Sequence, residues 1–511
     1  MSSEKKILNK IVLGAGITTL GLFISKFLSY LYRLVVARIG PDAYGQISLG
    51  LAVVGLTSTF VALGLNKAIK KYVPEAREAD DKAMLKGLVH GALKLIVPAG
   101  IIMGIIVFFS ADLIAERVFN SPETAPIIRI FAFVPLFNKT TTVFTDYTIG
   151  HNTTKYRVAL RRVLQNVLQI SATLILIWMG YGVIGAAFGW LIGTILIMII
   201  SIYIVERDFG PLLTSDIKPK KMYPKMIKYS YPLIFASAIG TALGWGDTAL
   251  LGYFMDDASV GFYNAAYPTA VLISIPASAV GSLALSGFST LGAKGEGQSA
   301  ALKTTTRWVM AMAFPAFILM ALFSDQLLHL MFGTEYAVAG TALMILAFGK
   351  FFAASTGQLG AYLKSNGYTK IIFWNTTANF FLNIGLNIIL IPMYGIVGAA
   401  IATASSIIFV NTLLLLEVYR FDDTHPFNSR MIYTVPAVLA ALIPTYMIFK
   451  QAFTYTPYWA LIPAGILFMT IYTLVFLKIG GLTHYDKEII LSGARKAELE
   501  EEAKKVLNIL T

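Results

Sequence analysis

The sequence predicts an all-α integral membrane protein of about fourteen transmembrane helices, built as two parallel six-helix repeats followed by two further helices. The first observation behind this fold class is composition. Of 511 residues, 56% are hydrophobic and only 14% are charged, whereas a soluble domain carries about 25% charged residues. The second is that apolar stretches recur at about 20 residues, the length that crosses a hydrocarbon core ~30 Å thick. The third is an internal repeat.

The apolar stretches define the expected spans. They are 11–35, 46–66, 88–109, 126–148, 157–179, 182–204, 229–254, 259–285, 306–323, 340–363, 372–392, 396–416, 431–449 and 457–479. The first is too long for the hydrophobic region of a signal peptide and lacks a clear small-residue cleavage site, so we expect a membrane helix. No stretch between spans is long enough for a separate soluble domain.

The basic residues predict the orientation. The net charge of +13 does not indicate nucleic acid as a partner, because Lys and Arg accumulate on the cytoplasmic side of membrane proteins. With the N-terminus inside, only Arg38, Arg117 and Lys450 fall in outer loops. We therefore expect a multi-pass protein of the cell (plasma or inner) membrane with both termini cytoplasmic. In the tail, Glu498–Lys505 predicts a short charged helix.

The repeat is clearest in two outer turns. Tyr181–Ala187 reads YGVIGAA and Tyr394–Ala400, 213 residues later, reads YGIVGAA. Two weaker pairs, at offsets of 215 and 216, are His151–Lys155 with Asn366–Lys370, and Tyr44-Gly45 with Val260-Gly261. Parallel repeats are typical of alternating-access transporters whose substrate site lies between the halves.

The repeat sets the expected domain organisation. It comprises an N-terminal bundle (1–204), a cytoplasmic linker (205–228), a C-terminal bundle (229–417), two added helices (418–479) and a cytoplasmic tail (480–511).

Ionisable residues inside the spans are the candidates for function, because each costs about 2.5–3.5 kcal/mol to insert. They are Lys26, Arg33, Lys94, Arg129, Lys139, Asp146, Asp247 and Lys350. Apart from Lys94, which lies near a helix end and is expected to reach the interface, they occupy the first, fourth, seventh and tenth helices. The repeat makes these helices equivalent in pairs, so a cationic cavity suited to phosphate or pyrophosphate is expected.

We assign candidate roles from charge and depth. The expected substrate-binding residues are Lys26, Arg33, Arg129, Lys139, Lys350, Asn379 and Asn383. Asp247 and Asp146 are the candidates for coupling, and the alternative for Asp146 is a group of the inner rim. We hypothesise that Arg33 and Asp247, at similar depth in opposite halves, pair in one conformation.

A stripe of asparagines runs along the eleventh expected span at four-residue intervals, formed by Asn375, Asn379, Asn383 and Asn387. Amides suit sugar hydroxyls, but they also hold membrane helices together through hydrogen bonds. Both interpretations stay open at this point.

Enzyme signatures are missing from the sequence. There is no DxD, GxSxG, HExxH or P-loop pattern, no cysteine, and no metal-ligand spacing among the five histidines. We expect no enzyme activity and no cofactor. Without a nucleotide motif, transport is expected to draw on a Na⁺ or H⁺ gradient or on the membrane potential, worth about 2.3 kcal/mol per charge at 100 mV.

Several motifs resemble a known family in their order along the chain. They are Ala37–Gly45, Gly64–Ala68, Tyr231–Ile234, Asp247–Tyr253, Val260–Tyr267, Phe332–Tyr336 and Pro392–Ala400. The sequence is similar to polysaccharide or oligosaccharide flippases, in the superfamily that also contains multidrug extruders and lipid II flippases. Asp247 stands at a motif position of that family.

The resemblance implies a flippase that moves a polyprenyl-(pyro)phosphate-linked oligosaccharide from the cytoplasmic to the outer leaflet, for surface polysaccharide or glycoprotein assembly. It implies cavity cations for the lipid phosphate, here Lys26, Arg33, Lys139 and Lys350, and a glycan polymerase or glycosyltransferase as partner. Fourteen helices also resemble lipid II and sporulation flippases. The alternatives are a lipid II-type flippase, a multidrug cation antiporter, a membrane glycosyltransferase or ligase, and a scaffold for glycan assembly.

Overall fold

The computed structural model describes residues 21–151, 153–293, 297–452, 458–483, 486 and 491, and every regular element in these ranges is helical. The beginning of the first expected span and the tail helix expected at Glu498–Lys505 lie outside the described residues.

A helix over residues 21–37 comes first. The α-helices that follow are α2 (Pro41–Ala62), α3 (Leu65–Glu78), α4 (Lys82–Phe109), α5 (Ala111–Leu113), α6 (Ala125–Phe131), α7 (Val134–Gly150), α8 (Lys155–Arg157), α9 (Gln165–Trp178), α10 (Gly182–Phe209), α11 (Tyr223–Phe254), α12 (Asp257–Val271), α13 (Ile275–Ala293), α14 (Gln298–Leu322), α15 (Ser324–Phe332), α16 (Gly340–Ser355), α17 (Leu359–Ser365), α18 (Thr369–Asp422), α19 (Thr434–Ala452) and α20 (Leu461–Lys478).

The helices confirm the predicted fold class. Within the described ranges, eleven helical segments are long and apolar enough to cross a membrane. The helix over 21–37 and α11, 32 residues long, add two crossings at expected positions. The 54-residue α18 supplies one more, because its backbone breaks at Gly395, between the expected spans 372–392 and 396–416. The described helices therefore match the fourteen expected spans.

The glycine at the same place in each copy of the repeated turn has a positive φ. Gly182 has φ 51° and Gly395 has φ 56°, values in the left-handed region that glycine adopts without a steric penalty. A glycine in the same place of both motifs is thus required by the same tight reversal between helices.

Contacts divide the chain into two compact units. Unit 1 contains the chain up to Pro268 together with Thr376–Thr403, and unit 2 contains Thr269–Asn375 together with the chain from Ala404 onward. This grouping differs from the domain boundaries expected from the repeat, which follow sequence similarity rather than contacts and stay a prediction.

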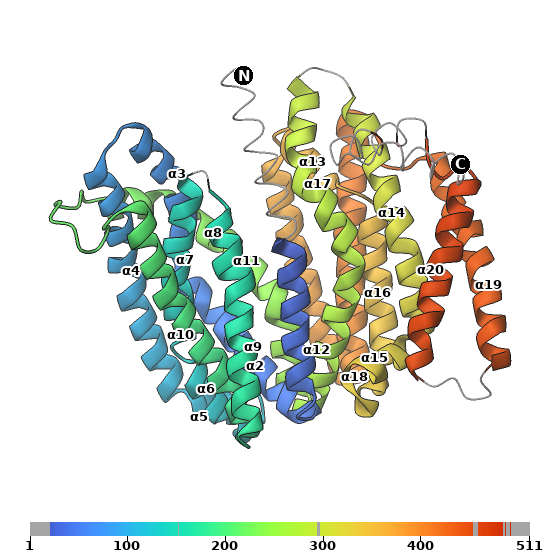
Figure 1. Cartoon of the computed structure of the whole chain (residues 1–511), viewed down its shortest axis with the longest axis horizontal. Coiled ribbons are helices and arrows are strands. Elements are labelled where there is room, and N and C mark those ends of the chain that lie inside the picture. The colour runs from blue at the N-terminus through green and yellow to red at the C-terminus, as the bar shows by residue number, and fades with distance from the viewer. Residues whose placement is uncertain are drawn as a thin grey trace. The chain divides into compact units, whose positions relative to one another are not determined.

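In unit 1, α9 and α10 lie side by side (Figure 1), and small residues lie at their contact. A Cβ on Gly189 would come within 2.5 Å of Thr173, and one on Gly193 within 2.7 Å of Gln169. Small residues allow this approach, which replaces the hydrophobic driving force that lipid does not supply.

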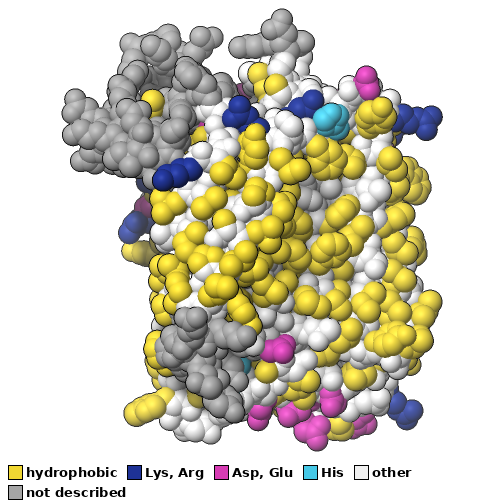
Figure 2. Space-filling view, turned by 90° about the vertical axis from the view of Figure 1, so that its right-hand side faces the viewer, with side chains coloured by type: hydrophobic (Ala, Val, Ile, Leu, Met, Phe, Trp, Pro, Cys, Tyr) yellow, Lys and Arg dark blue, Asp and Glu magenta, His cyan; other side chains and the backbone are white. Residues whose placement is uncertain are grey.

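Unit 2 presents a surface that matches a bilayer. On the face turned to the viewer in Figure 2, hydrophobic side chains form a broad belt between a rim with Lys and Arg and a rim with Asp and Glu. The helix α14 runs across the hydrophobic belt, with Lys303 near its beginning and Asp325 just beyond its end. The basic end is the one that the predicted orientation places in the cytoplasm.

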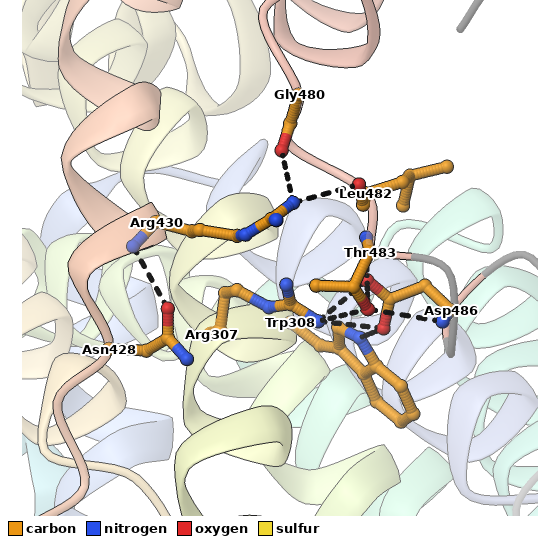
Figure 3. A network of polar contacts seen from close by, with 8 residues as sticks. All are labelled: Arg307, Trp308, Asn428, Arg430, Gly480, Leu482, Thr483 and Asp486. Atoms are coloured by element: carbon orange, nitrogen blue, oxygen red, sulfur yellow. Dashed lines mark hydrogen bonds and ion pairs between the residues drawn. The ribbon is translucent and has the colours of Figure 1, made fainter.

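A buried ion pair fixes the chain after α20 to α14 (Figure 3). Asp486 accepts hydrogen bonds from Arg307 Nη2 at 2.7 and 2.6 Å and from Trp308 Nε1 at 2.8 Å, and both ion-pair side chains are only 3% exposed. Burial acts to raise the pKa of Asp486, but hydrogen bonds from Thr483 and Trp308 and the charge of Arg307 outweigh it, so the pKa lies below its usual value.

The same carboxylate is also bonded to the chain just before it. The backbone N–H of Thr483 donates to Asp486 at 2.7 Å, and the backbone N–H of Asp486 donates to the Thr483 hydroxyl at 3.2 Å. Arg430 adds a second clamp, since its Nη1 donates to the carbonyls of Gly480 and Leu482 at 3.1 and 3.2 Å.

Candidate functional site

Asp247 lies on α11 in unit 1 with only 7% of its surface exposed. Its Oδ2 accepts hydrogen bonds from the hydroxyls of Tyr263, at 2.7 Å, and Thr403. Its Oδ1 accepts one from Asn387 Nδ2 at 2.8 Å. The helices α11, α12 and α18 thus supply a buried carboxylate surrounded by uncharged donors.

No Lys, Arg or His among the described residues forms an ion pair with Asp247. A buried charge is costly unless it is paired, and three neutral hydrogen bonds compensate it only in part. Asn387 Oδ1 is also buried and accepts no hydrogen bond from the part of the chain that the structure describes. Carboxylate, amide and hydroxyl oxygens are the ligands that hard cations prefer, so the residues fit a small monovalent cation or a proton.

A divalent metal fits the described residues less well. No group of three or more His, Cys, Asp or Glu side chains suited to a metal occurs among them. The single carboxylate of Asp247 matches one positive charge.

Arg33, on the helix over 21–37, lines a cavity of about 140 Å³ within unit 1. Its Nη1 donates to the Tyr44 hydroxyl at 3.1 Å. The remaining lining is polar but uncharged, or apolar: Ser29, Tyr32, Ile47, Ser48, Leu51, Asn166, Trp190, Trp245 and Asn264. No carboxylate occurs among the lining residues that the structure describes, which offer one guanidinium together with aromatic and amide groups.

Asp146 occupies a different environment on α7. It is fully buried, and its two oxygens lie 3.2 Å from Lys70 Nζ and 3.2 Å from Arg157 Nη1. Burial lowers the pKa of Lys70 below its ordinary value, although the negative charge of Asp146 acts to raise it. The carboxylate is therefore neutralised by two cations of its own unit.

More positively charged residues lie around Asp146. Arg161 donates to the hydroxyl of Thr142 and, at 3.1 Å, to Asn138 Oδ1. It lies on a π-helical segment, Val158–Leu164, a wide turn often found at functional sites. Lys139 lies close enough for its charge to interact with those of Arg161 and Asp146. Lys139 and Asp146 both belong to α7, seven residues apart, the spacing from which the sequence predicts a shared face. We call Lys70, Lys139, Asp146, Arg157 and Arg161 the inner cluster.

The other predicted cations lie elsewhere. Arg129, on α6, pairs with Asp112, and both side chains are more than a third exposed. Lys26 belongs to the helix over 21–37, and Lys350 belongs to α16 in unit 2. Neither lies in the lining of the Arg33 cavity.

The asparagine stripe on α18 has two roles rather than one. Asn387 and Asn383 are buried, and Asn387 bonds Asp247 directly. Asn375, at the other end of the stripe, donates to Glu417 at 2.7 Å within unit 2, which is helix packing. Asn379 lies between them, half-buried, with an oxygen that accepts no bond from the described residues.

Sequence reasoning missed three residues at Asp247. Asn387 had a signal, its place in the stripe, and Tyr263 lies in the motif Val260–Tyr267, whereas nothing in the sequence distinguished Thr403. The structure has no ion pair between Arg33 and Asp247: Arg33 is bonded to Tyr44 and Asp247 to uncharged donors. The hypothesis that they pair in one conformation stays a prediction.

Comparison with known families gives two matches. The pattern of the family described as polysaccharide biosynthesis protein matches residues 11–286, more than half of the chain. The MatE pattern matches residues 232–389.

Three similar proteins illustrate these relationships. The "probable low-salt glycan biosynthesis flippase Agl15" of Haloferax volcanii is 26% identical over 408 residues, covering 79% of this chain and 80% of the relative. The lipid II flippase MurJ in an inward closed conformation superposes with a TM-score of 0.72 at 18% identity, covering 89% of this chain and 98% of MurJ. An inward-facing multidrug resistance MATE family transporter of the MOP superfamily gives 0.61 at 18% identity, covering 77% and 93%. Both structural likenesses concern the fold.

Proposed function

This chain belongs to the polysaccharide biosynthesis protein family, and on that premise we propose that it is a flippase for lipid-linked saccharides. The expected cargo is an oligosaccharide on a polyprenyl phosphate or pyrophosphate, moved from the cytoplasmic to the outer leaflet of the cell membrane. Two findings support this proposal: the multi-pass fold and the name of the Haloferax relative.

One observation carries the choice of cargo: the described residues that line the Arg33 cavity include a guanidinium and no carboxylate. A cavity for a cationic drug requires negative charge, whereas a phosphate is bound well by the planar fork of Arg. The indole and phenol rings beside Arg33 suit a sugar ring by apolar stacking, and Asn166 and Asn264 suit its hydroxyls. This pattern favours an anionic glycolipid over the multidrug cation antiporter considered above.

The Asp247 site supports coupling to a cation. Binding one Na⁺ or H⁺ would neutralise a carboxylate that uncharged groups compensate only in part. Among the two predicted coupling residues, Asp247 suits this role better than Asp146, because Asp146 is already paired with Lys70 and Arg157. Movement of one charge through a membrane potential of 100 mV supplies about 2.3 kcal/mol, enough to bias a transport cycle.

In the proposed cycle, Arg33 binds the phosphate from the cytoplasmic side while the prenyl chain stays in the bilayer. Rearrangement of the helices then exposes the head group to the outer leaflet, and cation exchange at Asp247 resets the protein. Every step is binding or movement and none makes or breaks a covalent bond, so the proposal contains no enzyme activity. Delivery to a glycan polymerase or glycosyltransferase completes the proposed pathway.

The test is a flipping assay in proteoliposomes that contain a fluorescent polyprenyl-pyrophosphate sugar, with and without a Na⁺ or pH gradient. We compare the wild type with Arg33→Gln, Lys139→Ala and Lys350→Ala. Loss of flipping in Arg33→Gln at unchanged folding, measured by size exclusion and melting temperature, is the expected result. Flipping that survives in Arg33→Gln but fails in Lys139→Ala would move the phosphate site to the inner cluster.

Two further outcomes separate the alternatives. Efflux of a cationic dye without glycolipid flipping would establish a drug antiporter. Equal transport of lipid II and of a glycan on a monophosphate carrier would assign a broader, lipid II-type activity. A well-folded wild type that moves no lipid under any gradient would refute the proposed function.

A further inference from the structure

The first turns of α2 and α12 meet backbone to backbone within unit 1. A Cβ on Gly45 would lie 1.8 Å from the carbonyl oxygen of Asp257, and one on Gly261 would lie 2.2 Å from that of Pro41. The two contacts are related by the repeat, since Pro41 and Asp257, like Gly45 and Gly261, are 216 residues apart. Each copy of the repeat therefore places its glycine against the other copy's backbone, and no side chain separates them.

Tyr44, adjacent to the first glycine, joins the Arg33 cavity to α12. Its hydroxyl accepts a hydrogen bond from Arg33 at 3.1 Å and donates one to the backbone carbonyl of Asn264 at 2.8 Å. The Tyr44 side chain is 2% exposed, so water does not compete freely for either bond. One hydroxyl thus connects the guanidinium to the backbone of the facing helix.

Asn264 is linked to the Asp247 site in two ways. It directly follows Tyr263, whose hydroxyl is bonded to Asp247. Its Nδ2 donates to Thr248 Oγ1 at 3.2 Å, and Thr248 directly follows Asp247 on α11. Hydrogen bonds therefore connect Arg33 through Tyr44 to Asn264. Asn264 in turn is next in the chain to Tyr263, which bonds Asp247, and bonds Thr248, which is next in the chain to Asp247.

We propose that Tyr44 is a positioning residue that couples the occupancy of the Arg33 cavity by a phosphate to the occupancy of the Asp247 site by Na⁺. This inference rests on the proposed function for the identity of the two ligands. Tyr44 lines the Arg33 cavity with an uncharged hydroxyl that is bonded to Arg33, and it acts by linking the geometries of the two sites.

The physical basis is competition at both ends of the chain. A phosphate in the cavity competes with the Tyr44 oxygen for the guanidinium of Arg33. A cation at Asp247 competes with the donated hydroxyl hydrogen of Tyr263 and so displaces that side chain and its neighbour Asn264. Because the glycine contacts leave no space between α2 and α12, a shift at either end reaches the other. Coupling between two sites is reciprocal, so each ligand changes the affinity for the other by the same factor.

The experiment measures the affinity of the purified full-length protein for radioactive Na⁺ with and without farnesyl pyrophosphate as the anionic probe. For the wild type we expect the probe to change the Na⁺ dissociation constant by about tenfold, within the usual range for coupled sites. For Tyr44→Phe, which keeps the ring and removes the hydroxyl, we expect each ligand to bind within a few-fold of wild type while the coupling factor falls to near one.

Tyr147→Phe is the matched control. Tyr147 is 1% exposed in the core of unit 1 and makes no hydrogen bond to the residues that the structure describes, so this variant should keep the tenfold coupling. Thr248→Val cuts the second link and is expected to lower the coupling factor, and it carries the test should Tyr44→Phe fail to fold.

Equal coupling in wild type and Tyr44→Phe would overturn the inference, and so would a wild type that binds both ligands independently. The proposed function fails in a different way: a wild type that binds neither ligand refutes it and the inference together.

Discussion

Unit 1 contains two buried aspartates with opposite surroundings. Asp146 has Lys70 and Arg157 at 3.2 Å and further cations nearby, whereas Asp247 is held by two hydroxyls and one amide. A carboxylate with its counter-ions in place is part of the structure, and removing it leaves unpaired cations. A carboxylate with neutral donors only keeps an uncompensated charge, which suits the cation exchange proposed above. The same residue type at similar burial therefore serves stability in one place and is suited to ion binding in the other.

The largest expected difference comes from neutralising each aspartate in turn. Asp247→Asn should reduce ion-driven flipping by on the order of a hundredfold. Residues that only hydrogen-bond an ion's ligand typically contribute about 10–100-fold to ion affinity, and Asp247 is the proposed ligand itself. Its melting temperature should stay close to that of wild type. The measurement is the initial rate of flipping under a Na⁺ gradient, and a rate within twofold of wild type would remove Asp247 from the coupling mechanism.

A smaller functional effect is expected from one hydroxyl of the same site. Thr403→Val preserves shape and removes the donor to Asp247, so we expect Na⁺ affinity to change by about tenfold with flipping still detectable at saturating Na⁺. Thr412→Val serves as a control, because among the described residues the Thr412 hydroxyl bonds only the carbonyl one turn earlier, Ile408, at 2.8 Å. Identical Na⁺ affinities in the two variants would show that Thr403 has no special role.

At the inner cluster the expected effect is on stability. Asp146→Asn should destabilise the protein by about 2 kcal/mol, below the range for fully buried pairs because Lys70 and Arg157 are each 31% exposed. The Na⁺ dependence of flipping should remain. Thermal unfolding in detergent measures the loss, and adding Lys70→Met should recover part of it. A double variant less stable than Asp146→Asn alone would contradict the assigned compensation.

The smallest effect is expected at Arg129. Its pair with Asp112 is exposed on both sides, and such pairs contribute at most about 1 kcal/mol. Arg129→Gln should leave flipping and melting temperature nearly unchanged. A large loss of flipping would instead restore Arg129 as a substrate-binding residue, as first expected from its position in a span.

Much of this arrangement follows from sequence by simple physics. The cost of unsatisfied backbone groups in lipid allows only helices for apolar segments of this length, so the spans were predictable. The repeat was predictable from the similar motifs at Tyr181–Ala187 and Tyr394–Ala400. The break at Gly395 was also predictable, since two expected spans meet there. Charge within spans identified Arg33, Lys139, Asp146 and Asp247, because insertion makes each of them costly without a purpose.

What the sequence by itself determined is thus the membrane fold, the repeat and a short set of charged residues. Only the tertiary structure decided which charges have partners. Lys70 and Arg157 meet Asp146 from α3 and α8, and Thr403 meets Asp247 across 156 residues. Periodicity specifies which face of a helix a residue occupies, but not which helix lies opposite. The same limit explains why the contact of Gly45 with α12, and the bridge through Tyr44, could be found only once the helices were packed.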